Sequence, residues 1–162
     1  MTAKPGFIWT FEHYTPDGVL VETKKNIMPL QGLNHWIDVL LGKTTQHSQW
    51  YMGLFSGAYT PLASDTASAF PAAATEFTAY SGNTRKSFVV SSAYGGVSNN
   101  DASPAEFEFT SNGTIYGGFL ASASGKNATT GILLSAVRFD VPKPKEPTDI
   151  LRVRAELGLI SE

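Results

Sequence analysis

The sequence has no cysteine among its 162 residues and no long apolar run. The missing cysteines exclude a disulfide framework and any thiolate metal site, and they fit a chain that folds in a reducing cytoplasm. The longest apolar cluster, at residues 36–42, is interrupted by Asp38 and is far shorter than the roughly 20 residues that cross a bilayer. Residues 1–18 carry no secretion-signal pattern. We therefore expect no membrane partner.

Charge of one sign is not concentrated anywhere in the chain. The 12 Lys and Arg residues and the 14 Asp and Glu residues give a net charge of −2, without long blocks of like sign. Nucleic-acid binding domains carry a basic patch or stripe, and the sequence has no such feature. We expect no nucleic-acid partner.

Motifs of catalysis and metal binding are also missing. The three histidines, His13, His35 and His47, lie in different predicted elements and lack the spacing of a metal site. The nearest approach to a nucleophile elbow, "GLFSG" at residues 53–57, lacks the G-x-S-x-G spacing. The glycine pairs of the chain do not form a phosphate-binding loop. We predict no catalytic residue, no metal site and no cofactor.

What the sequence does contain is a series of short strand patterns separated by turn residues. Residues 7–14 and 19–25 favour strands, and "TPDG" between them supplies a tight turn, so we predict an opening hairpin. Asn112 and Gly113 form the pair that a type I′ turn prefers, which predicts a second hairpin around them. The further predicted elements are a strand at 50–57, a hairpin over 76–93, the Asn-Gly hairpin over 106–120, a strand at 132–141 and a proline-rich link at 142–147.

One segment predicts a helix. Its apolar residues recur at helical spacing, and Gly42 follows where a C-terminal cap would lie. These apolar residues are Leu30, Leu33, Ile37, Leu40 and Leu41. We predict one short helix near residues 30–41.

The last strand, at residues 149–160, alternates apolar and charged residues. A period of two places one face in a core and the other toward water or a partner. The residues predicted to face the core are Leu151, Val153, Ala155, Leu157 and Leu159, and those predicted to face outward are Arg152, Arg154 and Glu156.

These patterns together predict the fold class. Many short strands, frequent turn signals and a single early helix favour an all-β protein, an antiparallel β-sandwich of a single domain over residues 1–162. A jelly-roll-like sandwich is our first expectation and an immunoglobulin-like sandwich the second.

Interface residues are predicted from exposed aromatic and charged positions. Residues 58–75 form a long loop without a clear period, and such loops are typically functional or disordered. Phe70 lies alone in this loop, and we expect it to anchor on a neighbouring subunit, with folding back on its own chain as the alternative. The predicted interface residues are Phe70, Tyr59, Tyr94, Arg152 and Arg154. Trp9, Trp50 and Tyr51 are expected either in an ordinary core or on a sugar-stacking platform.

Most of the chain resembles small virion proteins of tailed bacteriophages, in particular capsid decoration or cement proteins. The resemblance lies in "NIMPLQGLNHWIDVLLG", "WYMGLFSG", "TEFTAYSGNTRKSF", "GTIYGGFLAS" and the alternating strand "DILRVRAELGLI". It implies a β-sandwich that binds the outside of an assembled head and reinforces it without chemistry. The expected partner is then the major capsid protein, and the expected location is the virion surface, with the host cytoplasm during assembly.

The resulting expectation is a non-enzymatic virion structural protein that forms a homo-oligomer, a dimer or a trimer. A tail, baseplate or fibre-associated virion protein is one alternative. A carbohydrate-binding sandwich module is another, and a hydrolase with an unrecognised site is the third.

Overall fold

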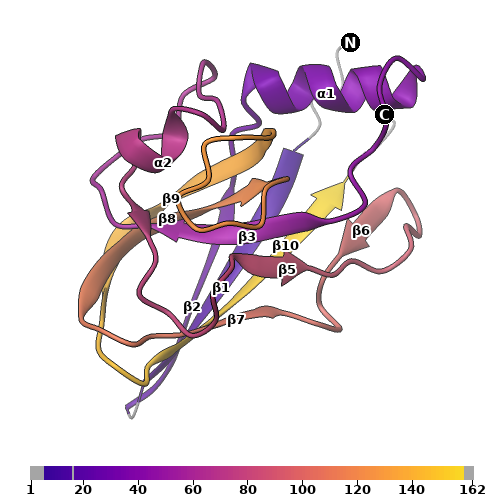
Figure 1. The fold of residues 1–162 in the computed structure, drawn as a ribbon. Coiled ribbons are helices and arrows are strands. Elements are labelled where there is room, and N and C mark those ends of the chain that lie inside the picture. Colours follow the sequence, from indigo (N-terminus) through magenta and orange to yellow (C-terminus); the bar gives the residue numbers. More distant parts are fainter. Residues whose placement is uncertain (1–5, 16, 159–162) are drawn as a thin grey trace.

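The computed structural model describes residues 6–15 and 17–158, and it has the predicted all-β sandwich fold. Two five-stranded antiparallel sheets pack against each other, and α1 (Leu30–Leu40) and α2 (Phe70–Ala73) lie at one end and one side of them (Figure 1). Sheet A contains β2 (Gly18–Lys25), β1 (Gly6–Thr15) and β10 (Ile150–Gly158), and β10 also pairs with β6 (Val97–Asn99) and β7 (Ala105–Glu108). Sheet B contains β9 (Leu133–Lys145), β8 (Gly113–Ala121) and β3 (Trp50–Phe55), and β3 also pairs with β4 (Glu76–Phe77) and β5 (Lys86–Phe88).

The main core lies between the two sheets and is built from alternate residues of the central strands. Trp9 of β1 pairs across the sheet with Ala155 of β10, and both side chains are buried. The indole N–H of Trp9 donates a 3.0 Å hydrogen bond to Ser135 Oγ of the opposite sheet. The predicted inward face of the last strand is confirmed at Leu151, Val153 and Ala155, whereas Leu157 is half-buried and Leu159 lies outside the described residues.

The opening hairpin is confirmed, because β1 and β2 pair antiparallel from Ile8–Lys25 to Thr15–Gly18.

The predicted helix is also confirmed as α1, and Gly32 explains how closely α1 approaches sheet B. A Cβ atom at Gly32 would lie 2.7 Å from the carbonyl oxygen of Leu134. Gln31 fixes the same turn of α1, because its Oε1 accepts hydrogen bonds from the N–H groups of Ala67 and Leu133.

A second, smaller core covers the outer face of sheet B, and it corrects the prediction for residues 58–75. This segment folds back across the sheet and contains the short helix α2, which the sequence did not indicate. Phe70 packs on Phe55 and Phe119 with ring centroids 5.6 and 5.2 Å apart. The Phe70 side chain therefore packs on its own sheet.

Both later hairpins were predicted wrongly. β7 pairs with β10 in sheet A, whereas β8 pairs with β3 and β9 in sheet B, so the Asn112–Gly113 segment connects two sheets. β4 and β5 both pair with β3 and not with each other, so they lie one after the other along the same edge. The Lys126 ammonium group donates hydrogen bonds to carbonyl groups of Thr78, Tyr80 and Gly82. These bonds hold the connection between β4 and β5 in a wide loop, so it does not form a tight turn.

The proline-rich link at 142–147 is partly strand, because β9 extends to Lys145. Pro144 lies opposite Thr114 of β8. Proline is tolerated in the last strand of a sheet, where its missing N–H faces away from the ladder. β9 is the last strand in the order of sheet B.

Candidate functional site

Two of the predicted interface residues lie in the second core. Phe70 is 1% exposed, which corrects its assignment to an interface with another subunit: the ring is covered by its own chain. Tyr59 is half-buried against Phe70, and its hydroxyl group donates a 2.6 Å hydrogen bond to Asp65. This hydrogen bond and burial raise the pKa of Tyr59 to about 12, so the hydroxyl stays protonated near neutral pH.

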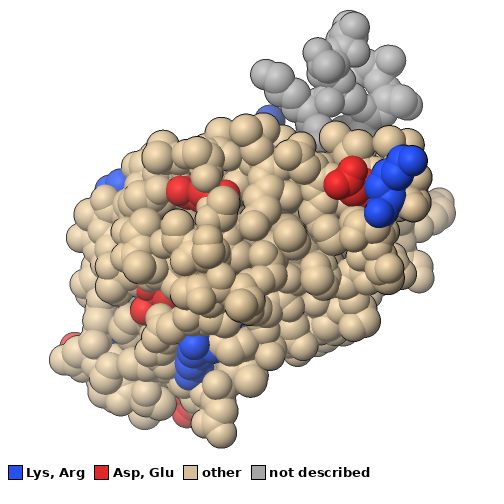
Figure 2. All heavy atoms as spheres, turned by 45° about the horizontal axis from the view of Figure 1, so that its top comes forward, with Lys and Arg blue, Asp and Glu red and all other residues tan. Residues whose placement is uncertain are grey.

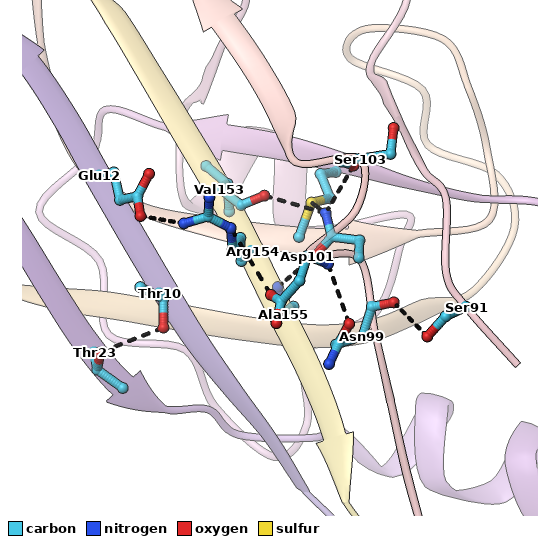
Figure 3. A network of polar contacts seen from close by, with 12 residues as sticks. Thr10, Glu12, Thr23, Ser91, Asn99, Asp101, Ser103, Val153, Arg154 and Ala155 are labelled. Carbon is cyan, nitrogen blue, oxygen red and sulfur yellow. Dashed lines mark hydrogen bonds and ion pairs between the residues drawn. The ribbon is translucent and has the colours of Figure 1, made fainter. Parts of the chain in front are cut away.

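The two predicted arginines lie on the outer face of sheet A, and both have acidic partners within the chain. Arg152 pairs with Glu106 of β7, and Arg154 pairs with Glu12 of β1. Figure 3 shows Arg154 between Glu12 and Asp101, whose carboxylate lies 3.8 Å away. Cross-strand pairs of opposite charge stabilise a sheet modestly, so these contacts explain the charged face without a partner. An interface role for both arginines stays a prediction.

Tyr94 differs from the other four predicted residues. Its side chain is 91% exposed and follows the exposed valines Val89 and Val90 on the connection between β5 and β6. An interface role for Tyr94 also stays a prediction.

The three aromatic residues considered for a sugar platform do not form one. Trp9 is completely buried between the sheets. Trp50 and Tyr51 are half-buried neighbours on β3, and successive side chains of a strand point to opposite faces. Trp50 packs against the main core instead.

A pocket of about 590 Å³ opens at the end of the sandwich where α1 lies. Residues of α1, of both sheets and of the segment before β3 surround it. Its apolar and aromatic lining includes Phe7, Trp36, Val39, Trp50, Phe88 and Leu157. A volume of this size and an apolar lining are typical of pockets that accept a small ligand or a few side chains of a partner.

Two histidines line one wall of this pocket, although they are twelve positions apart in the sequence. The rings of His35 and His47 lie with centroids 4.9 Å apart, and the Trp50 ring meets both edge to face. Burial lowers the pKa of His47, and the neighbouring His35 lowers it further. Nε2 of His35 is shielded from solvent and has no hydrogen-bond partner among the described residues. The wall therefore favours the neutral form of the His47 ring.

The outer side of α1 adds an apolar surface next to the pocket. Its exposed residues are Leu30, Ile37, Leu40 and Leu41, and Leu62 of the neighbouring segment is exposed as well. The N–H of Leu30 donates a 2.9 Å hydrogen bond to Ala63, which brings the two segments together. Figure 2, turned so that the α1 side comes forward, shows few charged side chains on this face. We call the pocket and these five residues the apolar end.

The sequence contained a signal for the apolar end that our interpretation did not use. Leu30, Leu33, Ile37 and Leu40 were used only to locate the helix, without a prediction of which of them are buried. The structure turns Leu33 toward the main core and leaves the other three exposed. Trp36 and Val39, which line the pocket, add a further apolar side. A helix with apolar residues on several sides is expected to be covered on more than one of them.

Within residues 6–15 and 17–158, no three His, Cys, Asp or Glu side chains are grouped so as to hold a metal ion. No helix in the same part of the chain is long and apolar enough to span a membrane. The geometry offers an exposed surface of apolar side chains next to a pocket. In the comparisons with known proteins, no family model, curated protein or solved structure matched the chain.

Proposed function

We propose that this chain is a non-enzymatic virion structural protein of a tailed bacteriophage. In this proposal it binds the major capsid protein on the outside of the head, as a decoration or cement protein does, and stabilises the head. The apolar end is its docking surface. The resemblance of the sequence to decoration proteins supports the choice of partner, and the apolar end supports a binding role.

The observation that carries the binding role is the row of uncovered leucine and isoleucine side chains on α1. Leu40 is 71% exposed, and Leu41, Leu30 and Ile37 are exposed beside it. Burying an apolar side chain of this size releases about 1.5–3 kcal/mol. A surface of this kind next to a pocket is typical of a protein interface, in which a partner side chain fills the pocket and a surrounding ring excludes water.

The chemistry of the apolar end also describes its partner. The pocket lining is mainly apolar and aromatic, and burial lowers the pKa of His47, which favours its neutral form. An aromatic or aliphatic side chain of the partner fits this lining, whereas a carboxylate or ammonium group would lose its hydration without gaining an ion pair. We therefore expect an apolar anchor residue on the capsid surface.

Co-sedimentation with assembled heads that lack this protein tests the proposal. Wild-type protein is expected to bind saturably, at a fixed ratio to the capsid subunit. Leu40→Asp places a carboxylate in the docking surface without disturbing the core, and it is expected to weaken binding by at least about tenfold.

Val141→Asp is the matched control, because Val141 is 68% exposed on the distal half of β9. This variant is expected to bind heads like the wild type. Absence of head binding would overturn the capsid assignment. Binding to purified tails would then favour the tail-associated alternative, and retention on a sugar resin would favour the carbohydrate-binding alternative.

A further inference from the structure

The free edge of sheet A is made by β2, the second strand of the opening hairpin. From Val19 to Lys25 this strand pairs with β1 on one side, and the described residues place no strand on its other side. The β1–β2 register runs without a bulge. A long and regular edge of this kind presents a row of backbone donors and acceptors that recognise another strand.

The first half of this edge lacks the charges that usually protect edge strands. Val19, Leu20 and Val21 are exposed, and the last two are each 63% exposed. The charges of the second half are directed to β9 of the other sheet: Glu22 accepts a 2.6 Å bond from Lys143, and Lys24 donates a 2.5 Å bond to Asp140. Edge strands normally carry a charged or proline residue at such positions.

We propose that β2 pairs antiparallel with β2 of a second copy of this chain. The two sheets A then continue into each other across a two-fold axis. The same surface patch of each copy forms the contact in this two-fold arrangement. Two-fold symmetry is the commonest symmetry of soluble homo-oligomers. The proposal concerns sheet A only, so it does not depend on the capsid partner or on the apolar end.

The sequence of β2 is complementary to itself in one register. When Leu20 lies opposite Leu20 of the second copy, Val19 lies opposite Val21 of the second copy. By symmetry, Val21 then lies opposite Val19 of the second copy. These cross-strand pairs bring four valine side chains together on one face of the joined sheets and the two Leu20 side chains together on the other face.

The charged residues of β2 and of the turn before it are compatible with the same register. Glu22 lies opposite Gly18 of the second copy, and Asp17 lies opposite Thr23, so no like charges face each other. Asp17 is also diagonal to Lys25 of the second copy, which is an attractive pair at a distance that long side chains span. The block of apolar pairs at the centre and the absence of like-charge pairs favour a second copy over an unrelated strand.

Sedimentation velocity of the full chain tests the dimer. Wild-type protein is expected to show a monomer–dimer equilibrium that depends on concentration. Val21→Lys places two like charges beside the two-fold axis and is expected to weaken dimerisation by at least about tenfold. Ser87→Lys is the control, because Ser87 is exposed on β5 at the edge of sheet B opposite β9, and it is expected to dimerise like the wild type. Circular dichroism and urea unfolding verify that both variants fold.

A cysteine variant tests the register directly, because the natural chain has no cysteine. Residues directly opposite in an antiparallel pair have Cα atoms about 4.5–5.5 Å apart, which a disulfide spans. Leu20→Cys is expected to give a covalent dimer under mild oxidation, whereas Ser87→Cys is expected to dimerise like the wild type without forming a covalent cross-link. A wild-type protein that is monomeric at every concentration would overturn the proposal. So would a dimer that survives Val21→Lys and does not cross-link through residue 20.

Discussion

Glu76 and Arg85 form a bidentate ion pair that is almost completely buried. Arg85 Nε lies 2.9 Å from Glu76 Oε1, and Nη2 lies 2.7 Å from Oε2. Arg85 also donates to the carbonyl groups of Ala123 and Ala128, and Glu76 accepts from the N–H of Asn127. The pair therefore ties β4 to the connection between β8 and β9.

Removing one charge of this pair is expected to be costly. Glu76→Gln leaves the Arg85 guanidinium buried without a counter-charge, and such a loss typically costs about 3–5 kcal/mol of unfolding free energy. The double variant Glu76→Leu with Arg85→Met removes both charges and is expected to recover much of this loss. Urea unfolding of the two variants measures both effects. A loss below about 1 kcal/mol for Glu76→Gln would contradict the assigned role of the pair.

Lys145 is expected to make stability rise with pH. Its Nζ atom has no hydrogen-bond partner among the described residues and lies 5.8 Å from the centre of the Phe109 ring. Burial lowers the pKa of Lys145 to about 7, from an ordinary value of 10.5. Between these two pH values the unfolded chain holds a proton that the folded chain lacks, so stability increases as pH rises from about 7 to about 10.5.

Lys145→Met tests this dependence. The variant removes the ionisable group, so it is expected to be more stable than wild type by on the order of 2 kcal/mol or more at pH 7. The difference is expected to shrink toward pH 10.5 and to vanish above it, where Lys145 is neutral in both states. Urea unfolding of both proteins at a series of pH values measures the gap. A gap that is constant or grows with pH would contradict this account.

His13 is expected to weaken the fold at acidic pH. Burial lowers its pKa, and the charge of Lys145 lowers it further, although Asp149 lies 3.6 Å away and opposes the shift. The unfolded chain therefore takes up a proton at higher pH than the folded chain, and stability falls as pH drops below about 6.5. NMR titration of the His13 ring measures the pKa directly. A value at or above 6.5 would contradict the prediction.

Gly32 is expected to be necessary for the position of α1. In Gly32→Ala the new methyl group meets the backbone of Leu133 and Leu134 at 2.7–2.8 Å, and backbone cannot move aside like a flexible side chain. Overpacking of this kind costs about 1–3 kcal/mol, although alanine itself favours a helix by about 1 kcal/mol. We expect a net loss of stability and weaker head binding, because α1 carries the proposed docking surface. Asn34→Ala, at an exposed position of α1, is the control and is expected to retain both properties.

Arg154→Glu separates the charged face of sheet A from the apolar end. The substitution removes the ion pair with Glu12 and brings a third carboxylate near Glu12 and Asp101. We expect a loss of about 1 kcal/mol in unfolding free energy and unchanged head binding. Loss of head binding by a folded Arg154→Glu protein would instead assign the interface to sheet A.

Local sequence patterns predicted where the strands lie better than they predicted which strands pair. Buried Ala105 and Phe107 alternate with exposed Glu106 and Glu108, yet this strand pairs with β10, more than forty residues away in sequence, and not with its neighbour β8. Two facing strand patterns and an Asn-Gly pair are compatible with a hairpin. Burial of Phe107 in the main core, where its ring meets that of Tyr80, decided otherwise, and no local rule contains that information.

The candidate site was harder to predict than the fold for the same reason. His35 and His47 belong to different elements, and only the return of the chain from α1 to β3 brings their rings together. Phe70 looked exposed because its neighbours are small and polar, but Phe55 and Phe119 of distant strands bury it. Helical periodicity located α1 correctly, whereas which of its sides stays uncovered depends on where sheet B lies.

The most direct test of the docking surface is the environment of residue 40 upon binding. In Leu40→Cys a polarity-sensitive fluorophore is attached at the single cysteine of the chain, and assembled heads are added. Docking through the apolar end predicts a saturable blue shift at residue 40 and none in the equally labelled Val141→Cys protein. Binding to heads with no change at residue 40, or with the shift at residue 141 instead, would contradict the account.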